Sequence, residues 1–177
     1  MVCFVSNLVL AYPTLDQKDF ELIQVIRASQ DRLYTAVDPH FTFVFPTEKL
    51  SAEALADHTE SVIQGCSKIG FVLTKALVVK DDPNSSWHAF LIPSIGAAEV
   101  TTLHDLLYTD TLASELRPDI PYIPHIGIAA NQDSVVVEEL VDNLNAKPIN
   151  IVGVIEALTV STFDGIRVKD TKRLSLA

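Results

Sequence analysis

The chain has 177 residues and a formal net charge of −10, from 13 Lys and Arg against 23 Asp and Glu. This length fits one domain of ordinary size or two very small ones, and 48% hydrophobic residues suffice for a core. The acidic balance argues against a protein that tracks along a nucleic-acid backbone, because such proteins draw most of their affinity from Lys and Arg contacts to phosphate. It remains compatible with one small phosphate-bearing ligand in a local pocket.

Several common classes are excluded by what the sequence lacks. No apolar run approaches the roughly 18 residues of a membrane span. The apolar N-terminus has no basic residue before Lys18, so we expect a buried strand there and not a signal peptide. Cys3 and Cys66 are the only cysteines, and we expect two reduced, packed thiols in a cytoplasmic protein. No Cys-x-x-Cys, glycine-rich phosphate loop or Gly-x-Ser-x-Gly motif is present.

The first half of the chain predicts alternating strands and helices. Strands are expected at 4–12, 40–45 and 70–79, and helices at 16–32 and 51–64, followed by a turn cluster at 81–86. The second half predicts strands at 87–93, 125–129, 149–161 and 166–175, and helices at 97–116 and 133–145.

Each half has the order strand, helix, Pro-His strand, helix, strand. This repeat predicts a duplicated α/β (α+β) unit, with two lobes related by a pseudo-twofold axis. We therefore expect one bilobal domain with antiparallel sheets and flanking helices around a central cleft. The lobes would comprise about residues 1–80 and 87–177, and strands can be exchanged between them.

The two Pro-His strands have similar alternation. Residues i and i+2 of a strand share a face, so His40, Thr42 and Val44 are expected on an open face. The opposite, core face would hold three phenylalanines, Phe41, Phe43 and Phe45. In the second strand the predicted core residues are Ile126 and Ile128, and the predicted open face holds His125, Gly127 and Ala129.

Two imidazoles facing each other across a cleft suit phosphoester chemistry. The unperturbed pKa of histidine, about 6.5, allows one ring to be neutral and the other protonated near neutral pH. The neutral ring can activate water and the protonated ring can supply a proton to the departing oxygen. A hydroxyl two residues further on can donate to a phosphate oxygen. This scheme needs no metal and no cofactor.

The motifs Pro-His40-Phe-Thr42-Phe and Pro-His125-Ile-Gly127-Ile resemble the paired His-x-Thr/Ser motifs of the 2H phosphoesterase superfamily. The nearest resemblance is to its bacterial branch, called 2′-5′ RNA ligase or RNA 2′,3′-cyclic phosphodiesterase, and it covers nearly the whole chain. It implies a bilobal fold with both histidines at the base of a cleft. It also implies metal-independent hydrolysis of 2′,3′-cyclic phosphates, with His40 and His125 as the acid–base pair and Thr42 as a phosphate contact.

Gly127 departs from this pattern, because the family has Thr or Ser there. Its backbone or a water would have to replace the missing hydroxyl, so three hypotheses stay open. The chain is a cyclic phosphodiesterase for small cyclic nucleotides or RNA 3′ ends, a non-catalytic nucleotide- or phosphate-binding module, or an unrelated α/β domain that acts through protein contacts. We expect a cytoplasmic monomer that binds neither membranes nor duplex DNA.

The other candidate residues have ordinary structural explanations. His58 and His104 are expected to pack within their helices. Only one of Trp87 and His88 can face the core, and the sequence does not say which. Aromatic residues that could stack on a base, although packing is the simpler expectation, are Trp87, Tyr34 and Tyr122. Basic residues predict a charged edge strand, with a minor alternative near the ligand phosphate: Arg167, Lys169, Lys172 and Arg173.

Overall fold

A computed structural model describes residues 5–81, 86–117 and 121–177. Cys3 and most of the turn expected at 81–86 lie outside these residues. The elements follow in chain order: β1 Ser6–Ala11, β2 Thr14–Leu15, α1 Gln17–Gln30, β3 Phe41–Thr47, α2 Ala52–Val62, β4 Ile69–Asp81, β5 Ser86–Ile95, α3 Ala97–Leu107, a 3-10 helix Asp110–Glu115, β6 Ile126–Asn131, α4 Ser134–Asn145, β7 Ile151–Ile155, β8 Ala157–Phe163 and β9 Val168–Ser175. This alternation confirms the expected α+β class.

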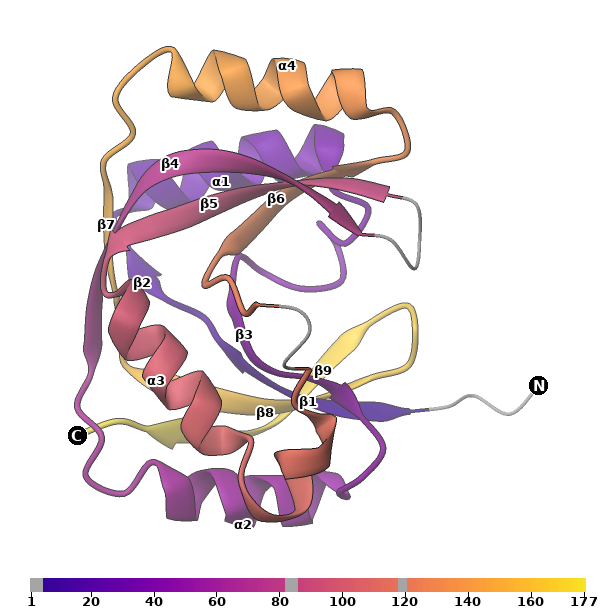
Figure 1. Cartoon of the computed structure of the whole chain (residues 1–177), viewed down its shortest axis with the longest axis vertical. Helices are drawn as coiled ribbons and strands as arrows, with labels where there is room; N and C mark the ends of the chain where they lie inside the picture. The colour runs from indigo at the N-terminus through magenta and orange to yellow at the C-terminus, as the bar shows by residue number, and fades with distance from the viewer. Residues whose placement is uncertain (1–4, 82–85, 118–120) are drawn as a thin grey trace.

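The strands form two antiparallel sheets, and each sheet draws strands from both halves of the chain. The four-stranded sheet has the order β3-β1-β8-β9, and the five-stranded sheet has the order β2-β7-β4-β5-β6. Helices α1 and α4 lie on the five-stranded sheet, α2 packs on the four-stranded sheet, and α3 contacts both (Figure 1). No helix in the described part of the chain is long and apolar enough to span a membrane.

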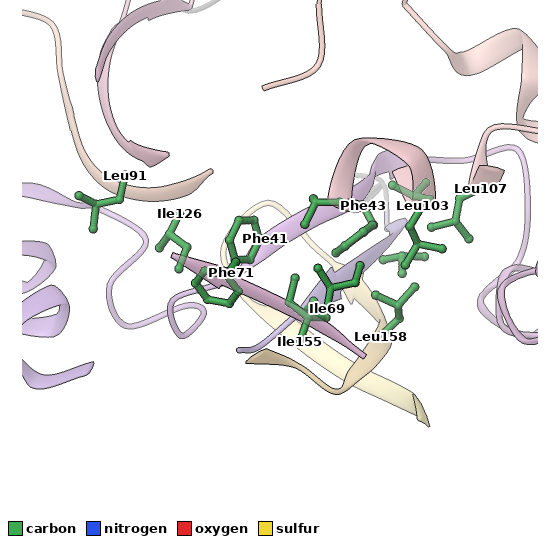
Figure 2. Packing of buried hydrophobic residues seen from close by; sticks show 14 of the residues in the cluster. Phe41, Phe43, Ile69, Phe71, Leu91, Leu103, Leu107, Ile126, Ile155 and Leu158 are labelled. Atoms are coloured by element: carbon green, nitrogen blue, oxygen red, sulfur yellow. The ribbon is translucent and has the colours of Figure 1, made fainter. Parts of the chain in front are cut away.

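One hydrophobic core joins the two sheets (Figure 2). Phe41 of β3 and Phe71 of β4 meet edge to face, with ring centroids 5.0 Å apart, although they belong to different sheets. Both are fully buried, and burying one such side chain contributes roughly 1.5–3 kcal/mol. The apolar face predicted for the first Pro-His strand is thus what fixes one sheet against the other.

Two predicted elements are shorter than expected. The helix expected at 97–116 ends at Leu107, whose carbonyl oxygen lies 2.8 Å from Nε2 of His58, and a separate 3-10 helix begins at Asp110. Asp110 has a φ of 48°, which an α-helix cannot accommodate. The strand expected at 149–161 is two strands, because the chain leaves the five-stranded sheet at Glu156 and enters the four-stranded sheet. A continuous run of apolar residues does not show where the chain passes from one sheet to the other.

Candidate active site

Each Pro-His motif stands at the start of an edge strand. β3 is the outermost strand of one sheet and β6 is the outermost strand of the other. His40 and His125 immediately precede these strands, and the prolines before them, Pro39 and Pro124, are buried. Both histidine residues are half-buried. The two motifs therefore occupy equivalent places in the two sheets.

The same backbone contact holds both imidazoles. Nδ1 of His40 lies 2.7 Å from the carbonyl oxygen of Asp38, and Nδ1 of His125 lies 2.6 Å from that of Ile123. A carbonyl oxygen can only accept a hydrogen bond, so Nδ1 carries the hydrogen and donates it. In the neutral ring, Nε2 is then the unprotonated nitrogen. Each histidine thus has its basic nitrogen on the far side of the ring from its anchor.

The two rings also interact electrostatically. Burial lowers the pKa of His125 to about 4; the hydrogen bond to Ile123 opposes this, and positive charge on His40 and His88 adds to it. Burial likewise lowers the pKa of His40, and the Arg27 guanidinium adds to that effect. Both lowered pKa values favour the neutral form of the rings at pH 7.

The residues two positions after the histidines are Thr42 and Gly127, and both are half-buried. Thr42 pairs with Leu10 of β1, and Gly127 pairs with Phe90 of β5. A Cβ atom built at Gly127 would meet no other atom within 4 Å. The glycine is therefore not required by crowding at the Cβ position.

A β-bulge interrupts each motif strand at the same place. In the register of β3, Thr42 and Val44 face consecutive residues of β1, which leaves Phe43 as the extra residue. In β6, Gly127 and Ala129 likewise face consecutive residues of β5. Three predicted orientations are therefore wrong: Val44 and Ala129 are buried, and Phe45 is 47% exposed. A bulge reverses the alternation beyond it, and here it does so three residues after each histidine.

Different aromatic rings flank the two histidines. Phe90 stacks on His125, with ring centroids 3.5 Å apart and planes at 13°. Tyr12 approaches His40 edge-on at 6.3 Å, and its hydroxyl donates to Oδ1 of Asp170 at 3.0 Å. The sequence reasoning missed both rings. Phe90 could have been found from its place two residues after His88, whereas nothing in the sequence singles out Tyr12.

Arg27 is a further residue that the sequence reasoning missed. Its charged side chain is buried, and it lies one helical turn after Ile23, the other buried residue of α1. It donates from Nη2 to the carbonyl oxygen of Val37 at 2.7 Å and from Nε to Asp31 at 2.8 Å. In the sequence, Arg27 could have been noticed as a basic residue four positions after an apolar one, which places both on the same face of a helix. Through Val37, Arg27 fixes the loop that carries the carbonyl anchor of His40.

The structure answers the open question about Trp87 and His88. Trp87 packs against the hydrophobic core, with Nζ of Lys80 5.7 Å from the centre of its ring. His88 lies on the other side of β5, where its ring is 5.8 Å from that of Phe90 and its charge affects His125. His88 is therefore a neighbour of the histidine pair.

His58 and His104 pack within the structure, as expected. His104 is buried and its ring stacks on Tyr122 at 3.7 Å, and His58 contacts the carbonyl oxygen at the end of α3. Tyr122 is therefore used in packing. Tyr34 is partly exposed. Within the described residues no cluster of His, Cys, Asp or Glu forms a set of three metal ligands.

Two open hollows share Tyr12 and Asp170 in their walls. One, of about 220 Å³, also has Thr159, Lys172 and Arg173 in its wall. The other, of about 320 Å³, is lined mainly by the loop that precedes His40: Tyr34, Thr35, Ala36, Val37 and Asp38. β9 is an edge strand, as its basic residues predicted, and Nζ of Lys172 pairs with Glu60 at 2.7 Å. These hollows adjoin His40 through the ring of Tyr12.

Comparison with known proteins gives a consistent result for fold and family. E. coli LigT, in a crystal structure with NADP+, superposes with a TM-score of 0.58 at 18% identity, covering 97% of both chains. A crystal structure described as a phosphoesterase gives a TM-score of 0.60 at 17% identity, covering 97% of this chain and 98% of that one. Kluyveromyces marxianus Usb1 gives 0.54 at 11% identity, with 97% and 98% covered. No curated protein sequence matches the chain.

The family model of the 2′-5′ RNA ligase superfamily matches residues 13–167. Together with this match, the two-sheet α+β fold identifies an enzyme of the 2H phosphoesterase class. This chain belongs to the 2′-5′ RNA ligase superfamily, and its activity is of the 2H phosphoesterase type. This membership contradicts the hypothesis of an unrelated α/β domain.

Proposed function

We propose that the protein hydrolyses 2′,3′-cyclic phosphates of small nucleotides or RNA 3′ ends, as a monomer in the cytoplasm and without a bound metal. His40 and His125 act as general base and general acid. The observation that carries this proposal is the paired anchoring of the two imidazoles. Both rings donate from Nδ1 to a backbone carbonyl, so both present Nε2 for proton transfer. Positive charge on His40 also lowers the pKa of His125.

In the proposed reaction, a phosphodiester anion binds between the two rings. Its negative charge raises both lowered pKa values, which allows one ring to hold a proton near neutral pH. The neutral ring accepts a proton from water as the water oxygen bonds to phosphorus. The protonated ring gives its proton to the ribose oxygen as the bond from that oxygen to phosphorus breaks. The product is a phosphate monoester, and the two histidines have exchanged protonation states: the base now holds a proton from water, and the acid has given its proton to the ribose oxygen.

The remaining residues have supporting roles in this proposal. The Thr42 hydroxyl donates to a phosphate oxygen as charge develops on it, whereas Gly127 offers only its backbone N–H. Phe90 and Tyr12 exclude water from one side of each imidazole. The net charge of −10 favours a small substrate or a short RNA end over a long polyanion. E. coli LigT has been crystallised with 3′-AMP and with phosphate, and Usb1 with uridine monophosphate, which supports a ligand of this size.

The test is turnover of 2′,3′-cyclic nucleotides, and of an RNA ending in a 2′,3′-cyclic phosphate, in excess chelator. We expect His40→Ala and His125→Ala each to lose about 10²- to 10⁴-fold in kcat. The matched control is His58→Gln, which keeps a donor near the Leu107 carbonyl and should retain wild-type activity. Equal turnover in all four proteins, or none in the wild type, would overturn the proposal.

The second candidate function is a nucleotide-binding module without turnover, and Gly127 is the observation that favours it. One transition-state donor can be worth about 10²- to 10³-fold in kcat, so its loss could leave binding without useful catalysis. Calorimetry with a nucleoside 3′-phosphate separates the two candidates. Binding with no measurable hydrolysis of the cyclic substrates would support the module.

A further inference from the structure

The hydroxyl of Tyr122 connects the two histidine motifs. Tyr122 lies three residues before His125, and its hydroxyl donates to the backbone carbonyl of Thr42 at 2.8 Å. Thr42 lies two residues after His40 in β3. The hydrogen bond therefore connects the backbone of one motif to a side chain just upstream of the other.

The outer edge of β3 is completed by side chains. Because β3 is the outermost strand of its sheet, backbone groups on one edge have no neighbouring strand. Tyr122 supplies a donor to the carbonyl of Thr42, and the hydroxyl of Tyr108 accepts a hydrogen bond from the backbone N–H of Phe45 at 3.0 Å. The two tyrosines thus satisfy neighbouring groups on the same strand.

The ring of Tyr122 is held firmly in this position. It stacks on His104 with centroids 3.7 Å apart and planes at 9°, and Phe45 meets it edge-on at 6.4 Å. His104 in turn contacts Tyr108 at 4.8 Å. Burial raises the pKa of Tyr122, and negative charge on Tyr108 and Asp105 raises it further. The Tyr122 hydroxyl therefore stays protonated and can donate its hydrogen.

The contact of Tyr122 bears directly on the orientation of His125. The next residue, Ile123, provides the carbonyl oxygen that accepts from Nδ1 of His125 at 2.6 Å. Fixing Tyr122 against β3 therefore fixes this carbonyl relative to the His40 motif. Proton transfer at both ends of a phosphodiester depends on this relative placement, since a displacement of about 1 Å can cost about 10²-fold in rate.

We propose that Tyr122 is a positioning residue whose hydroxyl sets the orientation of the His125 imidazole relative to His40. This inference rests on the proposed function, because it assigns a purpose to the geometry of the two histidines. Tyr122 touches neither reacting atom. It acts through Ile123 on one side and Thr42 on the other.

The test compares Tyr122→Phe with Tyr108→Phe. Both changes remove one hydroxyl from the same edge of β3 and keep an aromatic ring. We expect Tyr122→Phe to lower kcat by about tenfold or more, with KM for the cyclic nucleotide and affinity for a nucleoside 3′-phosphate little changed. Tyr108→Phe should keep a kcat close to that of the wild type, because the Tyr108 hydroxyl contacts the backbone N–H of Phe45 and not a residue next to a histidine anchor.

The outcomes separate this inference from the proposed function. Thermal unfolding of both variants measures the structural cost of each lost hydroxyl. Wild-type kcat in folded Tyr122→Phe, or an equal fall in both variants, would overturn the role of Tyr122 while hydrolysis by the wild type stands. If the wild type hydrolyses no cyclic phosphate, the proposed function fails and the positioning role fails with it.

Discussion

The two histidine motifs share a scaffold but are held by different chemistry. Each histidine precedes an edge strand, donates to a carbonyl two residues upstream and is followed by a bulge. Upstream of His40, the loop is fixed by the buried guanidinium of Arg27. Upstream of His125, the segment is fixed by the neutral ring of Tyr122. The same contact between a histidine and a backbone carbonyl is thus supported by a charged arginine at His40 and by an uncharged tyrosine at His125.

This difference affects the electrostatics of the two rings. The charge of Arg27 lies near His40 and adds to the burial that lowers its pKa. For His125, the charges that add to burial in lowering its pKa are those of other imidazoles, His40 and His88. The pKa of His125 therefore depends on the charges of His40 and His88, whereas the pKa of His40 depends on the charge of Arg27.

The largest expected effect concerns the charged support of His40. In Asp31→Asn, the buried guanidinium of Arg27 loses its carboxylate partner, so we expect the free energy of unfolding to fall by about 3 kcal/mol. Chemical denaturation measures this change. The control is Lys49→Met, which breaks the exposed pair with Glu115 and should change stability little. Equal stability of Asp31→Asn and the wild type would show that the loop before His40 does not depend on the ion pair.

The second prediction concerns the hydroxyl that only the first motif has. Thr42→Val keeps the shape of the side chain and removes the phosphate donor. We expect kcat on a 2′,3′-cyclic nucleotide to fall by about 10²-fold, with the fold unchanged. Steady-state kinetics and circular dichroism check this. An unchanged kcat would remove Thr42 from the proposed site.

The third prediction makes the second motif more like the first. Because a Cβ at Gly127 meets nothing within 4 Å, Gly127→Thr can restore a hydroxyl without crowding. We expect kcat to rise by about tenfold, which is less than the roughly 10²- to 10³-fold in kcat that one well-placed transition-state donor contributes. Gly127→Val adds the same bulk without the hydroxyl and should not raise kcat. An equal rise in both variants would assign the effect to packing.

The smallest expected effect is on the pH profile. Catalysis needs one neutral and one protonated imidazole, so kcat/KM rises as the first loses its proton and falls as the second does. Both pKa values are lowered in the free protein, and the maximum of kcat/KM should therefore lie below pH 6.5. The maximum of kcat should lie at higher pH, because the bound phosphate anion raises both values. Coincident maxima at or above pH 7 would contradict this assignment.

The sequence allowed most of the elements, the α+β class and the position of each histidine at the start of a strand to be predicted. Repetition and strand alternation carry that information locally. The orientations of Val44, Phe45 and Ala129 could not be predicted, because a bulge depends on the register with a neighbouring strand. The contacts of Arg27 and Tyr122 depend on chain segments that only the folded backbone brings together.

The most direct test of the central claim, that the two motifs form one phosphate site, is an NMR titration of the histidine rings. Signals of His40 and His125 are assigned from their alanine variants, and each pKa is measured with and without a nucleoside 3′-phosphate. In the free protein we expect both pKa values below 6.5, with that of His125 at about 4. The ligand should raise both together. A ligand that raises the pKa of only one ring, or of neither, would contradict a shared site.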